Sequence, residues 1–208
     1  ASAIKELVEN SIDAHARRVD IVLRDGGRSF LSVADDGIGI TREELPLAME
    51  RHATSKLLND NLETIATLGF RGEALPSIAS VSRLTLTSRQ KQAADAWTLR
   101  VEGGAKFEPE PVAHVTGTTV EVRDLFYATP ARLKFLKTAR TELNHVLDTV
   151  RRLAMAHPEI AFSLRDGERQ VLKLSHAQGD MIDARLDRLD AIMGNDFAAN
   201  AIPIEKDR

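Results

Sequence analysis

The sequence contains no cysteine, and this absence excludes several kinds of site. A chain without thiols has no disulfide framework, no thiol nucleophile and no cysteine-ligated zinc, and it is compatible with a reducing compartment. The six histidines include no pair at the spacing of metal ligands. We therefore interpret the histidines as surface or structural residues.

Long apolar runs are missing as well. No stretch approaches the roughly 20 consecutive apolar residues that a membrane-spanning helix needs, and no signal-peptide pattern opens the chain. The first residues already follow a helical pattern, so we expect the chain to begin inside a larger protein. The net charge of −3 argues against a nucleic-acid-binding surface that covers the whole domain, but it allows a local basic patch.

The chain has enough apolar residues to form a folded domain with a core, because they make up 43% of its 208 residues. Hydrophobic periodicity predicts an α/β fold built on a largely antiparallel sheet. A first hairpin is predicted over residues 19–34, and Thr41 with Glu44 predicts a capping box for a helix whose Leu45, Ala48, Met49 and His52 share one side. Further strands are predicted near residues 84–86, 97–101 and 120–122, with a helix over 143–154, a hairpin over 160–174 and a last helix that ends at Gly194.

The stretch from Lys5 to Ala14 predicts a helix whose polar residues lie together. Its apolar residues form one stripe, and Glu6, Asn10 and Asp13 share the opposite face. Around a metal-bound phosphate chain, Glu6 could act as general base towards a water, and Asn10 could lend its carbonyl oxygen to Mg²⁺. An ordinary amphipathic helix with a solvated face has the same pattern.

Asp35 closes a predicted strand and is followed by Gly37 and Gly39. This place suits a single buried carboxylate that accepts a hydrogen bond from a ligand amine, with glycine backbone that lets a flat ring come close. A plain glycine turn is the alternative. The two glycines are not a dinucleotide fingerprint, because Arg42 stands where the third glycine is needed and the preceding strands form a hairpin. No Walker A motif occurs either.

Residues 51–75 form a long connection that is polar and rich in small residues. Gly69 and Gly72 flank Arg71 directly before a predicted helix, so backbone N–H groups and a positive charge could meet phosphates there. A flexible surface loop explains the composition as well. Farther along the chain, a basic cluster could contact a phosphate backbone, or it could simply be a solvated face. The cluster consists of Arg132, Lys134, Lys137 and Arg140.

Four runs of residues occur in a fixed order: Glu6-x-x-x-Asn10-Ser11-x-Asp13-Ala14, Asp35-x-Gly37-x-Gly39, Gly69-Phe70-Arg71-Gly72-Glu73-Ala74-Leu75 and Gly117-Thr118-Thr119. Together they resemble the nucleotide-binding motifs shared by DNA gyrase B, Hsp90, histidine kinases and the MutL mismatch-repair proteins. Two further runs resemble the signatures of the MutL family itself, namely Arg51-His52-Ala53-Thr54-Ser55-Lys56 and Leu125-Phe126-Tyr127-x-Thr129-Pro130-Ala131-Arg132. The resemblance extends over essentially the entire chain.

The resemblance implies a two-layer α/β sandwich of the Bergerat type, with ATP held between the helices and a mixed sheet. It implies that Glu6 is the general base, Asn10 the Mg²⁺ ligand and Asp35 the acceptor for the adenine amino group. The remaining implied nucleotide contacts are Gly37 and Gly39 beside the adenine, Thr54 and Lys56 in the lid, the phosphate-loop residues Gly69, Phe70, Arg71, Gly72, Glu73 and Ala74, and Thr118.

By the same resemblance, residues 1–195 are an ATPase domain without its N-terminal arm, and residues 196–208 begin a second domain. The implied function is an ATP-gated dimerising clamp that links mismatch recognition to downstream repair. The implied partners are a MutS-type protein, DNA bound mostly without sequence preference, a downstream nuclease or helicase and a second subunit. We expect no membrane partner, a bacterial cytoplasmic, nucleoid-associated location, and weak Mg²⁺-dependent ATP hydrolysis by this chain alone as a monomer.

Two other classes remain open. A histidine-kinase-like module would not need the water-activating Glu6, and a catalytically silent DNA-binding clamp would rely on the basic cluster. The sequence also departs from the family pattern at four positions. Asp36 and Ala128 stand where asparagine is usual, His15 stands where glycine is usual and Pro76 stands where a small residue is usual.

Overall fold

The computed structural model describes residues 1–50, 73–177, 181–194, 197 and 200–201. The helices are α1 (Ser2–Asp13), α2 (Glu44–Leu47), α3 (Ala74–Ala79), α4 (Ala139–Ala156) and α5 (Met181–Met193), with short 3-10 segments η1 (Asp25–Gly27) and η2 (Pro130–Phe135). The strands are β1 (Arg18–Arg24), β2 (Phe30–Asp35), β3 (Arg83–Arg89), β4 (Ala96–Glu102), β5 (Ala105–Lys106), β6 (Glu110–Val112), β7 (Gly117–Arg123), β8 (Ala161–Asp166) and β9 (Arg169–Leu174).

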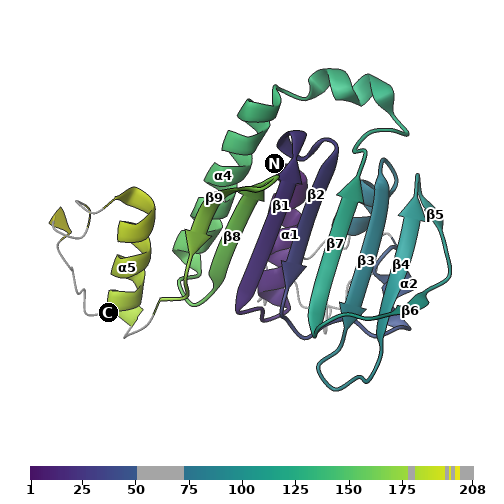
Figure 1. The fold of residues 1–208 in the computed structure, drawn as a ribbon, viewed down its shortest axis with the longest axis horizontal. Helices are drawn as coiled ribbons and strands as arrows, with labels where there is room; N and C mark the ends of the chain where they lie inside the picture. The colour runs from purple at the N-terminus through teal and green to yellow at the C-terminus, as the bar shows by residue number, and fades with distance from the viewer. Residues whose placement is uncertain (51–72, 178–180, 195–196, 198–199, 202–208) are drawn as a thin grey trace, which may run out of the picture.

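These nine strands form a single sheet in the order β5-β4-β3-β7-β2-β1-β8-β9, with β6 also paired to β4 (Figure 1). Among the described strands, β1 and β8 form the one parallel pair, and all other neighbours are antiparallel. A parallel pair needs a long crossover, and here the chain between β1 and β8 includes most of the domain. The predicted α/β fold with a mixed, largely antiparallel sheet is therefore confirmed.

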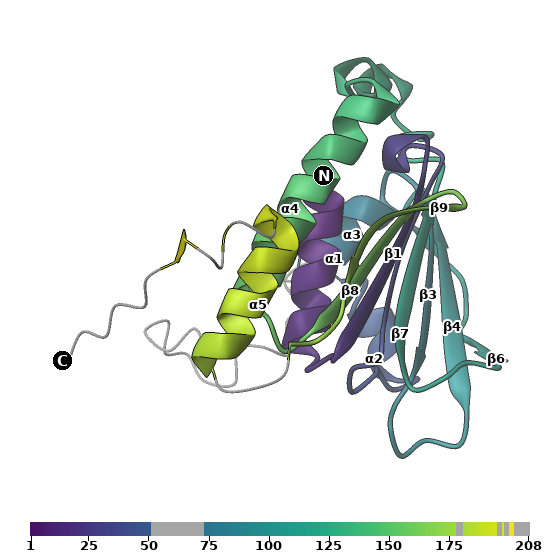
Figure 2. The same ribbon diagram turned by 60° about the vertical axis from the view of Figure 1, so that its left-hand side comes forward.

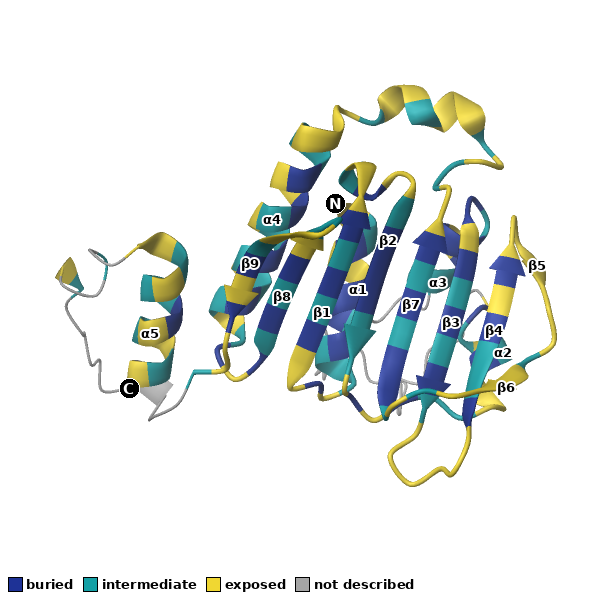
Figure 3. Ribbon diagram, in the orientation of Figure 1, coloured by how far each residue is buried: buried dark blue, intermediate teal, exposed yellow. Residues whose placement is uncertain are grey.

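The helices cover one face of the sheet, so the fold has two layers (Figure 2). Burial alternates along β1 and β3 (Figure 3). In β1 the side chains of Val19, Ile21 and Leu23 are fully buried. Helix α1 contributes Ile4 and Leu7 to the same core. Burying each such side chain stabilises the fold by roughly 1.5–3 kcal/mol. The core thus fixes which face of α1 meets the sheet and which face stays polar.

Helix α1 ends in a Schellman motif around His15. The His15 N–H donates to the Ile12 carbonyl at 2.9 Å, and the Ala16 N–H donates to the Ser11 carbonyl at 3.1 Å. His15 has φ of 57°, in the left-handed region that glycine adopts without a steric penalty. The backbone at His15 therefore favours glycine, which is the residue that the family pattern has at this position.

The predicted capping box is confirmed. The Thr41 N–H donates to the Glu44 carboxylate at 3.0 Å, and the Glu44 N–H approaches the Thr41 hydroxyl oxygen at 3.3 Å. The helix that follows is shorter than the spacing of Leu45, Ala48 and Met49 predicts, since α2 spans only Glu44–Leu47. The predicted His52 lies outside the described residues. The last helix ends where predicted, before Gly194 with its φ of 106°.

Arg188 on α5 is a buried residue that the sequence pattern did not single out, with 2% of its surface exposed. Its guanidinium donates to the carbonyls of Ala154, Pro158, Ile160 and Ser175 at 3.3, 2.9, 2.9 and 2.7 Å. Burial lowers the pKa of Arg188, and the charge of Glu159 opposes this change. The four bonds fasten α5 to the end of α4 and to the segments that flank the β8–β9 hairpin.

The end of the chain lies largely outside the described part of the structure. The predicted second domain, residues 196–208, includes only three described residues, 197, 200 and 201. Within the described ranges, no helix has the length and apolar character needed to cross a membrane.

The left-handed position at the end of α1 gives a stability prediction. Replacing His15 by Gly should raise the free energy of unfolding by about 0.5–1 kcal/mol, because it removes the steric penalty at positive φ and keeps both backbone hydrogen bonds. Urea unfolding measures the change. His157 is the matched control, since it caps α4 with φ of −126°. His157→Gly should destabilise through greater unfolded-state freedom; a loss of stability in His15→Gly would contradict the prediction.

Candidate functional site

Asp35 lies at the end of β2, where the sheet meets the last turn of α1. Its Oδ2 accepts a hydrogen bond from the Ser11 hydroxyl on α1 at 2.8 Å, and its Oδ1 accepts one from the Gly37 N–H at 2.9 Å. Thr118, its register partner on β7, adds a backbone hydrogen bond. Three segments far apart in the sequence therefore orient one half-buried carboxylate.

The surroundings of Asp35 act on its charge in opposite directions. Burial is the largest effect and raises the pKa of this carboxyl above its ordinary value. The hydrogen bonds from Gly37, Ser11 and Thr118 lower it, while the charge of Asp36 adds a smaller upward shift. A carboxylate offers about four lone-pair positions, so Asp35 keeps acceptor capacity for a ligand donor after these bonds.

The glycines beside Asp35 are required by the protein's own backbone. A Cβ on Gly37 would lie 2.6 Å from the carbonyl oxygen of Ala14 at the end of α1. A Cβ on Gly39, with φ of 75°, would lie even closer to the backbone carbonyl oxygen of Arg89, and one on Gly117, with φ of 117°, even closer to that of Asp35. The sequence suggested that glycine is needed at positions 37 and 39 to admit a ligand ring. The structure gives a second reason for glycine there, because three chain segments pack closely at these positions.

The polar face of α1 has the predicted composition. Glu6 is exposed, and Asn10 and Asp13 are half-buried. Glu9, which borders this face, is 7% exposed and forms an ion pair with Lys5 at 2.7 Å. Among described residues, no group of three or more histidines, aspartates and glutamates is arranged to hold a metal.

Ser11 is a site residue that belongs to the first motif but to which the sequence assigned no role. It is 2% exposed, and its hydroxyl lies 2.8 Å from Asp35 and 3.2 Å from the carbonyl of Leu7. A serine on the apolar stripe of α1, four residues after Leu7, was the signal available in the sequence. Its burial is explained by the carboxylate that it meets.

Thr118 is buried at the start of β7 and takes part in a hydroxyl network. Its hydroxyl lies 2.9 Å from that of Ser88, which donates to the carbonyl of Gly117 at 3.0 Å and accepts the N–H of Ile40 at 2.8 Å. Because the Ser88 proton is used on Gly117, the Thr118 hydroxyl is the donor to Ser88. Ser88, fully buried and not predicted, thus joins β3, β7 and the loop after Asp35.

The predicted phosphate-loop and lid residues do not contribute to the hydrogen bonds described around Asp35. Glu73 and Ala74 stand at the start of α3, which contacts α1. The predicted lid and phosphate-loop positions lie outside the described residues; they are Thr54, Lys56, Gly69, Phe70, Arg71 and Gly72.

Two other features lie at the opposite end of the sheet from Asp35. The basic cluster Arg132, Lys134, Lys137 and Arg140 lies on and just after η2, which follows the far end of β7 (Figure 1). A cavity of about 100 Å³ between η1 and the start of α4 is lined by Leu31 at the beginning of β2. Neither feature forms part of the arrangement around Asp35.

Comparison with known proteins identifies the family. Residues 1–127 match the family described as histidine kinase-, DNA gyrase B-, and HSP90-like ATPase. The chain is 65% identical over its full length to the DNA mismatch repair protein MutL of Rhodospirillum rubrum and 56% identical to that of Rhodopseudomonas palustris strain HaA2. It covers 33% and 35% of those two proteins, so it spans about a third of their length.

A solved structure shows the same relationship. The Aquifex aeolicus MutL ATPase domain complexed with ADP superimposes with a TM-score of 0.76 at 32% identity, over 92% of this chain and 67% of that one. Both the fold and the sequence identity therefore agree with one group of proteins. The chain belongs to the histidine kinase-, DNA gyrase B- and HSP90-like ATPase family and, within it, to the MutL proteins.

Proposed function

We propose that this chain is the ATP-binding and ATP-hydrolysing domain of a MutL-type DNA mismatch repair protein. The observation that carries the proposal is the half-buried Asp35, oriented by Ser11 on α1 and Gly37 in the following loop. Such a carboxylate can accept the amino group of adenine and reject a base with a carbonyl there. The Aquifex aeolicus MutL ATPase domain is complexed with ADP, which supports a nucleotide as the ligand here.

The phosphate chemistry is assigned to the polar face of α1. Asn10 directly precedes Ser11, so its amide lies one residue from the side chain that orients Asp35, and its oxygen is of the type that Mg²⁺ accepts. Mg²⁺, when bound, would neutralise charge on the phosphates. Glu6, one turn earlier and exposed, would take the proton from the attacking water.

The remaining contacts are proposed from the family relationship. Glu73 and Ala74 begin α3 beside α1, a position suited to the end of a phosphate loop. Gly37, Gly39 and Thr118 would shape the adenine side of the site. The other proposed lid and phosphate-loop contacts, Thr54, Lys56, Gly69, Phe70, Arg71 and Gly72, complete the set.

For the whole protein we propose an ATP-gated homodimeric clamp in the bacterial cytoplasm, associated with the nucleoid. It would link a MutS-type protein and DNA to a downstream nuclease or helicase, with residues 1–195 as the ATPase domain and 196–208 as the start of the next. A catalytically silent DNA-binding clamp is the second candidate, favoured by the exposed basic cluster on η2. Phosphate release measured with and without DNA separates the two.

The first prediction of this proposal concerns ATP binding. Asp35→Ala should cost about 1.5–3 kcal/mol of ATP affinity, the range for a hydrogen bond to a charged group. Calorimetry measures the affinity, and ATP with Mg²⁺ should raise the melting temperature of the unchanged protein but not of the variant at the same concentration. Asp25→Ala at the opposite end of the β1–β2 hairpin is the control. Unchanged ATP affinity in Asp35→Ala would remove Asp35 from the site.

The second prediction separates binding from hydrolysis. Glu6→Gln should keep the ATP dissociation constant but slow phosphate release by about 10²- to 10⁴-fold, because it removes a proton acceptor needed only in the transition state. Since Glu6 is exposed, stability should change by less than about 0.5 kcal/mol. Glu43→Gln, an exposed carboxylate on another segment, should hydrolyse ATP at the parent rate. Parent-like hydrolysis by Glu6→Gln would exclude the role.

The third prediction is a pH dependence without nucleotide. Burial raises the pKa of Asp35 in the folded state, so the folded protein binds this proton more tightly than the unfolded chain, whose Asp pKa is about 3.9. The free energy of unfolding, relative to Asp35→Asn, should therefore fall as pH rises from about 4 through the raised pKa, and then level off. Urea unfolding of both proteins from pH 3 to 7 measures the difference. An opposite slope would show that the hydrogen bonds outweigh burial.

A further inference from the structure

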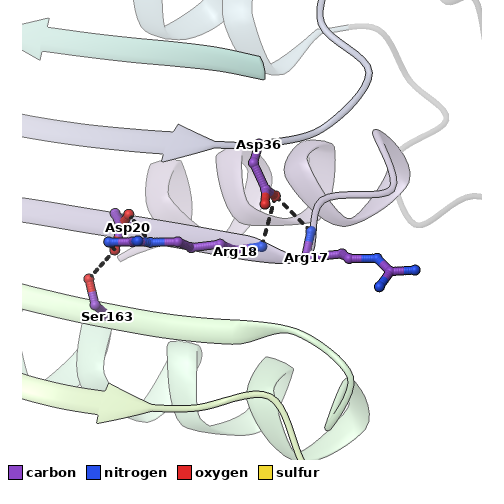
Figure 4. A network of polar contacts seen from close by, with 5 residues as sticks. All are labelled: Arg17, Arg18, Asp20, Asp36 and Ser163. Atoms are coloured by element: carbon purple, nitrogen blue, oxygen red, sulfur yellow. Dashed lines mark hydrogen bonds and ion pairs between the residues drawn. The ribbon is translucent and has the colours of Figure 1, made fainter. Parts of the chain in front are cut away.

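The loop that carries Asp35 is fastened to the chain segment that follows α1. Oδ1 of Asp36 accepts the backbone N–H groups of Arg17 and Arg18 at 2.7 and 2.8 Å (Figure 4). Two residues later, the N–H of Ile38 donates to the carbonyl of Ala14 at 3.0 Å. We use the name Asp36 clasp for the Asp36 carboxylate together with the two backbone N–H groups that donate hydrogen bonds to it.

The clasp lies between the two halves of the proposed site. On one side, Asp36 directly follows Asp35, and its own N–H reaches the carbonyl of Arg18 at 3.4 Å. On the other side, residues 14–18 continue from the last turn of α1, the helix that bears Ser11. Because Gly37 packs against Ala14 with no room for a Cβ, a small movement of either segment would change the separation of Asp35 from α1.

We propose that Asp36 is a positioning residue for nucleotide binding: its carboxylate fixes the distance between the Asp35 loop and the helix that carries Glu6 and Asn10. The proposal rests on the nucleotide role assigned to this site. Asp36 itself is exposed, and its two bonds are to backbone groups, so it acts through the loop and not through contact with ATP. Misplacing one binding group relative to another by about 1 Å is costly in sites of this kind.

The same network contains a matched control. Arg18 donates from Nε to Asp20 at 2.7 Å, and Asp20 accepts the Ser163 hydroxyl of β8 at 2.6 Å (Figure 4). Asp20 is thus also a carboxylate that joins two segments through hydrogen bonds. It lies within β1, and these bonds join it to side chains of β1 and β8 and not to the Asp35 loop. Replacing Asp20 therefore removes a similar set of hydrogen bonds while the Asp36 clasp stays intact.

The experiment compares three variants, Asp36→Ala, Asp36→Asn and Asp20→Ala. Asp36→Ala should weaken ATP binding in calorimetry about tenfold and speed hydrogen exchange of the Arg17 and Arg18 amides in the nucleotide-free protein. Asp36→Asn should bind ATP within about twofold of the parent, because its amide oxygen can accept the same two N–H groups. Asp20→Ala should keep the parent ATP affinity even where its melting temperature falls.

Three results would overturn the positioning role. One is ATP affinity at the parent level in Asp36→Ala although the two amides exchange faster. Another is an equal loss of affinity in Asp20→Ala, which would make the effect one of general stability. The third is Asp36→Asn as weak as Asp36→Ala, which would assign the effect to charge. Failure of the unchanged protein to bind ATP would instead overturn the proposed function, and with it the nucleotide role of Asp36.

Discussion

The carboxylate of Asp35 is held where the end of β2, the start of β7 and the last turn of α1 meet. Ser11, Gly37 and Thr118 each supply a hydrogen bond to it, and each comes from a different segment. A half-buried carboxylate is costly unless it is hydrogen-bonded, so these three segments stabilise one another through it. The site and the local fold therefore depend on the same group.

Close backbone packing supports this arrangement. Gly37 and Gly117 leave no room for a side chain between the Asp35 loop, α1 and β7, and Gly39 does the same against β3. Rigid packing of this kind holds binding groups more precisely than a loop alone could. Ser88, buried on β3 and in contact with Thr118, extends the support to a fourth segment through three short polar contacts. In the proposed site, Asp35 would thus offer its remaining acceptor capacity from a position fixed by these contacts.

Local patterns in the sequence predicted local structure well. The apolar spacing of α1, the β1–β2 hairpin and the Thr41–Glu44 capping box were all confirmed, because helix faces, strand alternation and caps depend on residues a few positions apart. The extent of α2 was less well predicted. Periodicity gives the face of a helix but not its length where tertiary contacts decide the last turn.

Residue identity and short spacing were enough to predict the family, the polar face of α1 and the place of Asp35 at a strand end. Only the folded chain shows that Ser11 orients Asp35, that Arg188 caps four carbonyls and that Asp36 joins the Asp35 loop to the segment after α1. The same holds for the parallel pairing of β1 with β8, which joins residues about 140 positions apart. Each of these contacts depends on segments that only folding brings together, and no local spacing encodes which distant backbone group a side chain will meet.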